Sequence, residues 1–589
     1  MNRMKKYLPL LAAAVLATLP AAAQEEDGGV SLKGSIQSDV LIPQEDQKIG
    51  TGTYKDWGLT NTYVDLQLLN KYVTAGARLE YLDHPLPGFE KEFKGWGVPH
   101  IYVTGRLKHA ELTVGDYYEQ FGSGFILRTY EERSLGIDNS LRGGRLVVKP
   151  VKGVTLKALA GQQRVYWHNR SWDKDFTYLN GKDPWIYGAD LELNVDQWFK
   201  RMDENGSRLT LGVSAVTKHE RTEDIVSLRP TGAQDAFGTD IIGAYKLNLP
   251  TDVGAIDVRA QFQKGNYSLM AEYALKSQDP SFDNGYIYRR GNALMLSGSY
   301  SKRGMSLLLQ AKRSEDMAFR SQRSRTGTAG FINHLPAFSQ QQTYALAALY
   351  PYATQNALGE WAFQGEFSYT FKRKTALGGK YGTTIKLNAS HIRGIDRQPL
   401  MAAGQPVEDL QGTKGYTTKF FRMGHDTYYQ DINVQLDKKV TKDFKLNLMY
   451  MHQRYNKTIV EGHGGTINSH IAIAEGKYTI NKNLTLRGEA QYLHTKQDQG
   501  DWWYGLLELS VLPHFMFTVS DMYNAKVPNT DETATSKQHF YMVSGCYTHG
   551  AHRLQLSYGK TRAGYNCSGG VCRYVPASKG LQVSYNFNF

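Results

Sequence analysis

The sequence predicts an all-β protein, a single large antiparallel β-barrel that spans a membrane. Apolar and polar residues alternate along most of the 589-residue chain, and tight polar turns join the alternating segments in pairs. Beyond the N-terminal segment, no run of apolar residues is long enough for a transmembrane helix. The mean hydropathy of −0.47 fits this fold, because only every second residue of a barrel strand faces lipid.

Residues 1–23 have the three features of a cleavable export signal. A basic start precedes an apolar run at 8–19 that is too short to span a bilayer, and alanines at 21–23 offer a cleavage site. A retained membrane anchor is the weaker alternative. We expect residues 24–33 to form a short periplasmic segment and residues 34–589 to form the barrel.

The C-terminus alternates strictly, with apolar residues at every odd position from 581 to 589. This pattern predicts a strand with one apolar face. The run that ends in Tyr585, Phe587 and Phe589 resembles the signal that the barrel-assembly machinery of Gram-negative outer membranes reads. The alternative is a closing strand of a soluble secreted β-domain, which the rest of the chain disfavours.

A hairpin unit repeats through the chain. Residues 256–263 and 267–276 alternate in polarity on either side of a Lys-Gly-Asn turn. About eleven such turns predict roughly 24 strands, within a bracket of about 18 to 26. We expect the tight turns to be periplasmic and the longer connections to be extracellular.

The formal net charge of +13 favours anionic solutes or the phosphates of lipopolysaccharide as partners. The basic residues are scattered over strands and turns, which excludes a nucleic-acid-binding surface. Of the three cysteines, Cys567 and Cys572 lie in a glycine-rich loop and are candidates for a disulfide. Cys546, within a strand, is expected to be an isolated thiol that is buried or faces lipid.

Residues 121–144 break the hairpin rhythm and combine glycines with charges of both signs. We interpret this segment as a loop that enters the lumen and forms a constriction, as in the eyelet of porins. The alternative is an extracellular loop of paired ions. The charged candidates are Arg128, Glu131, Glu132, Arg133, Asp138, Arg142 and Arg145.

Charged residues on the polar side of predicted strands are expected to face the lumen. They can form cross-strand ladders and, in an open barrel, set the ion preference. These wall charges are Asp65, Arg78, Glu80, Asp257, Arg259, Glu272, Arg487 and Glu489.

A second basic segment spans residues 312–325. It could bind lipopolysaccharide phosphate or attract anions, but an ordinary solvated loop is the favoured interpretation. Its basic residues are Lys312, Arg313, Arg320, Arg323 and Arg325.

Three segments carry a resemblance to a known kind of protein. Residues 121–124 read Phe-Gly-Ser-Gly, residues 130–139 read Tyr-Glu-Glu-Arg-Ser-Leu-Gly-Ile-Asp-Asn, and residues 333–340 read Asn-His-Leu-Pro-Ala-Phe-Ser-Gln. Together they resemble an uncharacterised porin-like outer-membrane family of Gram-negative bacteria. The resemblance implies a location and a fold, and it implies no catalytic residues.

The functional expectation is a porin-like channel for the passive passage of small hydrophilic, anionic solutes. Strands begin soon after the expected cleavage site, which argues against a plugged, energised transporter. The sixteen histidines are scattered without a recognisable catalytic or metal-binding context, so neither enzyme activity nor a metal or cofactor is expected. The alternatives are a binding or assembly protein whose loops hold a surface or periplasmic partner, a polysaccharide or a secretion component, and a membrane-embedded hydrolase.

Overall fold

The computed structural model of the chain describes residues 29–51, 54, 56–82, 84–89, 93–167, 183–221, 224–234, 240–402, 405–407, 409–526 and 537–589. The expected export signal (1–23) lies outside these residues, as do the first five residues (24–28) of the segment that was expected to follow it.

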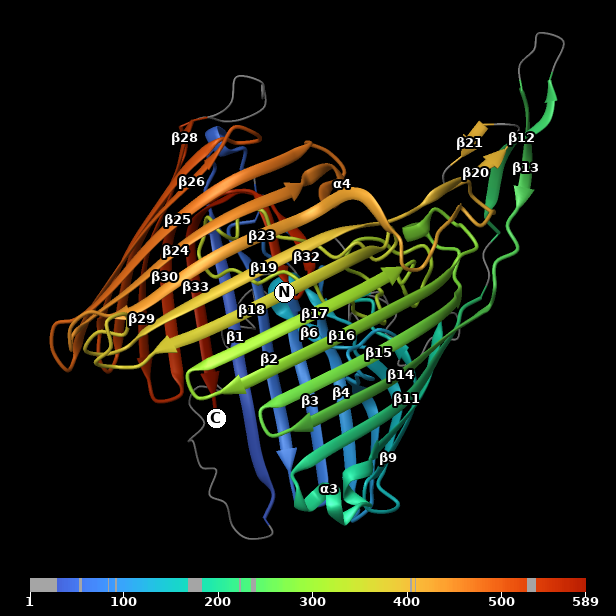
Figure 1. Ribbon diagram of the computed structural model, residues 1–589, viewed down its shortest axis with the longest axis horizontal. Helices are drawn as coiled ribbons and strands as arrows, with labels where there is room; N and C mark the ends of the chain where they lie inside the picture. Colours follow the sequence, from blue (N-terminus) through green and yellow to red (C-terminus); the bar gives the residue numbers. More distant parts are fainter. Residues whose placement is uncertain are drawn as a thin grey trace, which may run out of the picture.

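The described chain forms one closed sheet of 24 strands (Figure 1). Each wall strand pairs antiparallel with the next wall strand along the chain, and the last pairs with the first. The predicted fold class and strand number are therefore confirmed. The wall strands are β1 (Ser31–Pro43), β2 (Leu59–Leu69), β3 (Val73–Leu82), β4 (Gly95–Arg106), β5 (Ala110–Tyr117), β8 (Leu141–Val148), β9 (Val154–Gln163), β10 (Trp185–Asn194), β11 (Ser207–His219), β14 (Asp252–Lys264), β15 (Tyr267–Gln278), β16 (Arg290–Lys302), β17 (Met305–Glu315), β18 (Glu360–Phe371), β19 (Thr383–Ile395), β23 (Met423–Lys439), β24 (Phe444–Asn456), β25 (Thr466–Thr479), β26 (Leu484–Thr495), β27 (Asp501–Val511), β28 (Phe515–Lys526), β29 (His539–His549), β30 (His552–Thr561) and β33 (Ser578–Asn588).

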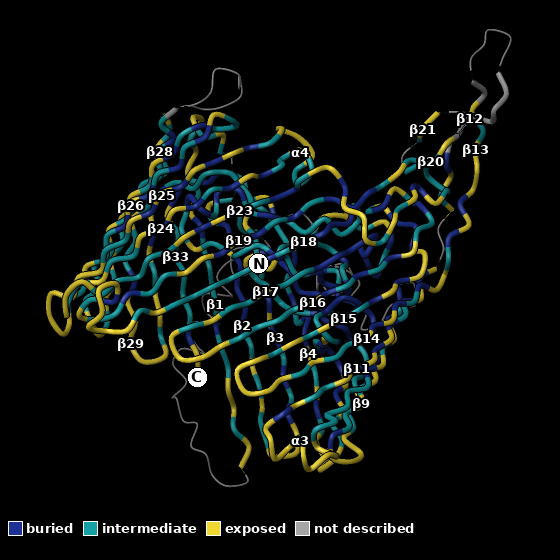
Figure 2. Tube along the Cα trace, viewed as in Figure 1, coloured by how far each residue is buried: buried dark blue, intermediate teal, exposed yellow. Residues whose placement is uncertain are grey.

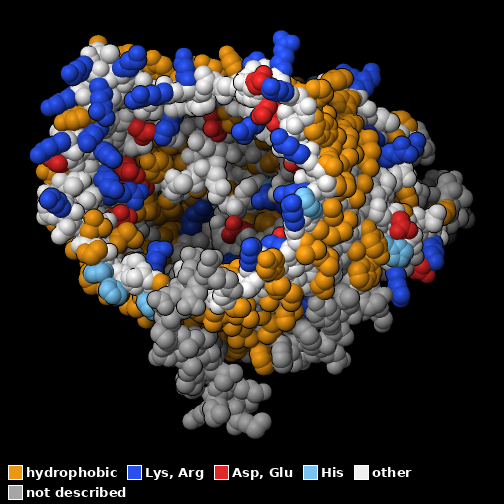
Figure 3. Space-filling model, turned by 90° about the horizontal axis from the view of Figure 1, so that it is seen from below, with side chains coloured by type: hydrophobic (Ala, Val, Ile, Leu, Met, Phe, Trp, Pro, Cys, Tyr) orange, Lys and Arg blue, Asp and Glu red, His pale blue; other side chains and the backbone are white. Residues whose placement is uncertain are grey.

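The alternation of the sequence becomes the two faces of the wall. On β14, Ile256 and Val258 point outward and are 53% and 47% exposed, whereas Asp257 between them points inward and is fully buried. An apolar band consequently covers the outside of the barrel (Figure 3). A closed sheet pairs every backbone donor and acceptor within the wall, which is the condition for strands to cross hydrocarbon. Among the described residues, no helix is long and apolar enough to span a membrane.

The connections differ between the two ends of the barrel. Short turns, such as 265–266 and 303–304, lie at one end, together with the short helix α3 (Lys200–Glu204). Longer loops lie at the other end, where the hairpin of β12 (Val226–Gln234) and β13 (Asp240–Lys246) projects beyond the wall (Figure 1). This asymmetry is the one predicted from the spacing of turn residues.

The two ends of the described chain close the barrel. Gly34 donates a backbone hydrogen bond to Phe589 (2.8 Å) and accepts one in return (2.9 Å). The ring of Phe589 lies over Gly34, where any Cβ would collide with it. Phe587 packs beside it against Ile36 and Val64. The terminal aromatic residues are thus part of the seam between β1 and β33, and β1 begins at Ser31, earlier than the predicted residue 34.

Candidate functional site: two loops folded into the barrel

Two loops fill much of the upper lumen. The first inner loop (118–140) joins β5 to β8, and the second inner loop (316–359) joins β17 to β18. Both are rich in buried apolar residues, and these pack in one cluster with inward-facing residues of wall strands from β9 to β27. Figure 2 shows the buried segments gathered inside the barrel beside β15–β17. Cluster members from the loops include Phe121, Phe125, Ile126, Leu127, Ile332, Leu335, Phe338 and Leu346.

The two inner loops are hydrogen-bonded to each other. Arg128 donates its backbone N–H to the carbonyl of Ile332 (2.8 Å), and His334 donates to the carbonyl of Gly124 (2.9 Å). The buried side chain of Asn333 donates to the carbonyl of Phe125 (3.0 Å). Because backbone groups of each loop satisfy those of the other, the two loops form one folded unit.

Arg78 of β3 ties the first inner loop to the wall. Its guanidinium contacts Asp65 on β2 (2.5 Å) and Glu131 in the loop (2.7 Å). Arg133, also in the loop, contacts both Asp65 (2.9 Å) and Glu131 (2.7 Å). These four alternating charges tie the charged part of the loop to the inner face of the wall.

A second ion cluster lies deeper. Arg164, just after β9, contacts Glu80 of β3 (2.8 Å) and Asp138 of the first inner loop (2.5 Å), and all three side chains are almost inaccessible to water. Burial by itself would raise the pKa of Asp138, but the guanidiniums of Arg164 and Arg78 outweigh it and hold that pKa well below its ordinary value. Asp138 is therefore ionised and held in place.

The tip of the first inner loop reaches the opposite wall. Ser123 donates its backbone N–H (3.0 Å) and its hydroxyl (2.8 Å) to Glu272 of β15. Gly122 beside it has φ of 52°, and a Cβ there would collide with the same carboxylate, so only glycine allows this approach. Nearby, Arg259 contacts Asp190 (2.7 Å) and Asp257 (3.3 Å) of the wall.

The remaining predicted residues take different places. Arg142 and Arg145 belong to wall strand β8 and not to the loop, where they pair with Asp116 (2.6 Å) and with Glu111 and Glu119 respectively. Their expected place in the loop is therefore corrected, because the sheet resumes at Leu141.

The structure also shows where the other predicted residues lie. Arg128 lies over the ring of Tyr130, and Glu132 caps the turn at Ser134. On the far wall, Arg487 contacts Glu489 (2.5 Å) and Glu475 (3.1 Å). A disulfide joins Cys567 to Cys572, which lie on β31 (Gly564–Ser568) and β32 (Val571–Val575), whereas Cys546 is a buried free thiol.

The second basic segment is not a solvated loop, which corrects the favoured interpretation. Lys312 and Arg313 are buried on β17, and Lys312 pairs with Glu360 of β18 (2.8 Å). Arg320 and Arg323 are buried in the second inner loop and pair with Asp283 (2.7 Å) and Glu220 (3.0 Å). Lys312, Arg320 and Arg323 turn inward because the loop folds into the barrel, so they anchor it and do not reach lipid headgroups. Arg313 lies on the opposite face of β17, over the ring of Phe420 and paired with Glu315 (2.7 Å).

Sequence reasoning missed the second inner loop and two of its anchors. Lys218 of β11 is fully buried, contacts Asp279 (3.0 Å) and donates to the carbonyl of Arg320 (2.9 Å). Lys276 of β15 donates to the carbonyl of Ala318. The available signal was the apolar content of residues 331–352, which is unusual for a solvent-exposed loop.

Space remains on the side of the lumen next to the seam. A cavity of about 420 Å³ lies between β1, β30, β33 and the segment after β30. Seen from the turn end, the barrel is hollowed, and charged side chains of both signs line the hollow (Figure 3). The polar residues around the cavity are Asp39, Thr561, Asn566, Ser578, Gln582 and Ser584.

Arg562 also lines this cavity. Its guanidinium donates to the carbonyls of Ala563 (2.9 Å) and Leu349 (3.5 Å), and no carboxylate of the described chain lies within ion-pair distance. Burial lowers the pKa of Arg562, an effect that Tyr350 and Asp498 partly oppose at longer range. A half-buried cation that borders a cavity and has no carboxylate within ion-pair distance attracts anions.

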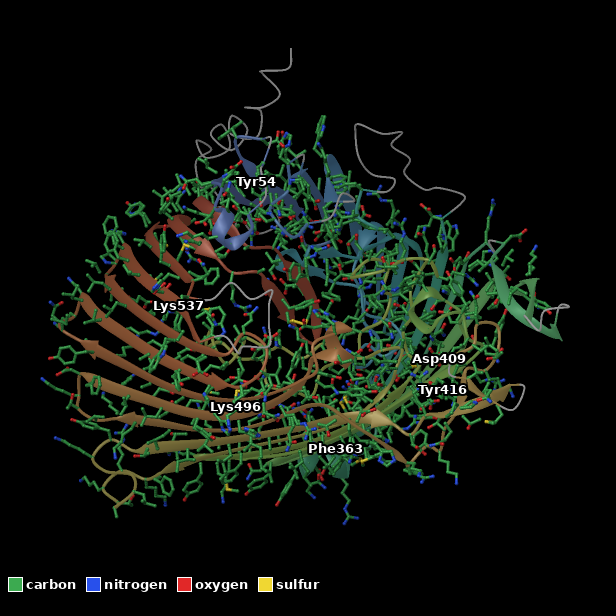
Figure 4. All side chains as sticks on the ribbon, turned by 90° about the horizontal axis from the view of Figure 1, so that it is seen from above. Tyr54, Phe363, Asp409, Tyr416, Lys496 and Lys537 are labelled. Carbon is green, nitrogen blue, oxygen red and sulfur yellow. A yellow bond between two sulfur atoms is a disulfide. The ribbon has the colours of Figure 1, made fainter. Side chains whose placement is uncertain are left out.

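The loop end carries one further ordered cluster outside the lumen. Tyr416 on β22 (Tyr416–Thr417) is buried between the guanidiniums of Arg289 (4.1 Å) and Arg397 (4.0 Å). Arg397 also contacts Asp409. Asp409 and Tyr416, both labelled in Figure 4, lie together at one side of the barrel. These contacts hold β22 against β20 (Gln398–Ala402), which gives the rim a defined shape.

Comparison with solved structures finds large barrels. A mutant of the ferric enterobactin receptor PfeA from Pseudomonas aeruginosa is 9% identical, with 96% of this chain and 81% of that chain covered and a TM-score of 0.42. The copper transporter OprC is 9% identical over 96% and 81% of the two chains, with a TM-score of 0.39. OccAB3 of Acinetobacter baumannii is 8% identical over 95% and 99%, with a TM-score of 0.31.

No curated protein matches the chain. A family model does match, and it extends over residues 4–589, which is almost the whole sequence. The chain therefore belongs to DUF6029, a family of unknown function.

Proposed function

We propose that this protein is a channel of a Gram-negative outer membrane that passes small hydrophilic, anionic solutes. The observation that carries the proposal is the cavity of about 420 Å³ beside the seam, which has a mixed polar and apolar lining and is bordered by Arg562. The inner loops fill much of the lumen beside β9–β27 and are also tied to β2 and β3, so passage would use the cavity that remains along β1, β30 and β33. The outward apolar band and the expected export signal support the outer-membrane location.

The lining of the cavity suits hydrated solutes. The hydroxyl, amide and carboxylate groups of the lining can hold water beside its apolar residues, such as Val40 and Leu86, whereas a wholly apolar constriction of similar width excludes water and closes. Arg562 adds a positive charge that no described carboxylate neutralises at short range. The path is therefore expected to conduct slowly, because it is narrow, and to prefer anions.

Single-channel recording in planar bilayers tests the proposal. Ser584 faces the cavity, and Ser584→Trp is expected to reduce the conductance severalfold. Val543 faces outward and is 50% exposed, so Val543→Trp serves as the matched control and should conduct as the parent protein does. A barrel that never conducts, or equal conductance of the two tryptophan variants, would contradict the proposal.

Ion preference is tested separately through the reversal potential in a salt gradient. Arg562→Glu is expected to move the preference from anions toward cations. Lys108→Glu, in the exposed turn after β4, makes the same change of charge far from the cavity and should have little effect. An unchanged reversal potential in Arg562→Glu would show that this residue does not face the path.

A binding or assembly role is the second candidate. One observation favours it: the β12–β13 hairpin and the strands β20 and β21 (Gln405–Val407) project beyond the barrel at the loop end (Figure 1). A channel should keep its conductance when the hairpin is deleted, whereas a protein that only binds a partner through its loops should not conduct at all. Assays of lipid release and peptide cleavage on the same preparation test the hydrolase alternative.

A further inference from the structure

We propose that the outer surface of β19 and β23–β26 binds the phosphate groups of a phosphorylated lipid in the outer leaflet. The site is a row of histidines and arginines that faces away from the lumen, near the loop end of these strands. The inference rests on the outer-membrane location proposed above and not on channel activity.

The row begins with three histidines that are side by side in the sheet. His452 of β24 lies opposite His470 of β25, and His470 lies opposite His494 of β26. The ring centroids of His452 and His470 are 4.7 Å apart. Antiparallel register places residues that face each other on the same side of the sheet, so the three imidazoles form one continuous strip.

The direction of these side chains follows from their neighbours. Met451 and Gln453 flank His452, and Ser469 and Ile471 flank His470, and all four are buried toward the lumen. Tyr450, two residues before His452, is 50% exposed on the outside. Because successive strand residues point to opposite faces, the histidines face the membrane side of the wall.

Two arginines extend the row. Arg454 of β24 lies opposite Gln430 of β23, which in turn lies opposite His391 of β19. The charges of Arg454 and Arg393 both act on His391. Arg393 donates to the carbonyl of His425 (3.1 Å), and among the described residues neither arginine has a carboxylate within 4.0 Å. The middle of the row is therefore a cationic patch without a counter-charge.

Hydrogen bonds leave donors of the row unused. Tyr450 meets His470 at Nδ1 (2.8 Å), which leaves the Nε2 of that ring free of this bond. Nδ1 of His452 is shielded from water and has no hydrogen-bond partner in the described part of the protein. The carboxylate of Asp501 is engaged by His494 (2.9 Å) and Tyr492 (3.1 Å) at the far end of the row.

The depth of the row in the membrane identifies the ligand. Toward the turn end, Tyr450, Tyr492 and Trp503 come next on the outer surface, and Leu448 and Leu507 follow. Aromatic residues mark the boundary between hydrocarbon and headgroups in barrels, so the row lies at headgroup level. Lys496, labelled in Figure 4, follows β26 at the same edge. Arginine and histidine at this depth meet lipid phosphates.

Native mass spectrometry of the full chain in detergent tests the proposal, with diphosphorylated lipid A and the same lipid without its phosphates as probes. We expect preferential binding of the phosphorylated lipid. The double variant Arg393→Gln/Arg454→Gln should bind it about 25-fold more weakly, from about fivefold per arginine. Arg303→Gln, in the exposed turn after β16, is the matched control and should bind as the parent protein does.

Other outcomes would overturn the proposal. These are equal binding of the two lipids, parent-like binding by the double variant, and displacement of the lipid by inorganic pyrophosphate at equal concentration. The variant His452→Gln/His470→Gln provides a second test if the arginine variant does not fold, and it should also bind more weakly. Conductance of either folded variant should equal that of the parent, which separates this site from the channel.

Discussion

Replacing Arg164 by methionine is expected to release the first inner loop. Arg164 is fully buried between Glu80 and Asp138, at 2.8 Å and 2.5 Å. Loss of one partner from a buried ion pair costs about 3–5 kcal/mol, because a charge is left unpaired. Arg78 remains 3.7 Å from Glu80 and 3.5 Å from Asp138, so the lower value of about 3 kcal/mol applies. The undocked fraction of the loop should then rise about a hundredfold.

Limited proteolysis with trypsin measures this fraction, because Arg128 and Arg133 lie in the loop and are cleavable only after undocking. Cleavage there should accelerate by about the same hundredfold. Arg106→Met is the matched control, since its contact with Glu111 at 3.1 Å is partly exposed, and such pairs contribute about 0–1 kcal/mol. Equal cleavage rates in the two variants would refute the reasoning, as would a fully protected loop in Arg164→Met.

The other predictions concern closure and pH. Gly34→Val places a Cβ where the ring of Phe589 lies, so the barrel should assemble poorly, visible as loss of the heat-modifiable gel band; a normal yield of the folded band would contradict this account of the seam. The pKa of Asp138 is lowered by Arg164 and Arg78 against the effect of burial, so its contribution is complete above the ordinary carboxyl pKa of about 3.9 and is lost as pH falls below it. Trypsin is inactive in acid, so hydrogen exchange should show this loss as reduced protection of the loop amides below about pH 4. Asp138→Asn should show the same loss of protection already at neutral pH. Protection of the parent loop that does not change in acid would contradict the assignment.

Local pattern was sufficient to predict the wall. The hairpin of β14 and β15 alternates in polarity over its whole length and turns at 265–266. Its register, with Ile256 opposite Leu275 and Asp257 opposite Ala274, follows from that alternation together with the two-residue turn. Counting such units predicted the number of strands, because each strand is recognisable from the alternation of its own residues and each turn from its own residue types. The inward direction of the wall charges followed for the same reason.

The site was decided by contacts between distant residues. Arg164 and Glu80 are 84 positions apart, and Ser123 and Glu272 are 149 apart; they meet only once the barrel has closed. The second inner loop has no period that predicts its path, so its buried charges, such as Arg320 and Arg323, were expected in solvent.

The sequence by itself therefore determined the wall, its faces and its two unlike ends, because successive residues of a strand face lipid and lumen in turn and differ in polarity accordingly. Tertiary structure decided which loops enter the lumen, which charges pair there and where the cavity with Arg562 remains. The physical reason is that burying a loop depends on the sum of apolar contacts and ion pairs from many strands, such as Arg78 with both Asp65 and Glu131. No short segment of the sequence contains all the residues that make these contacts.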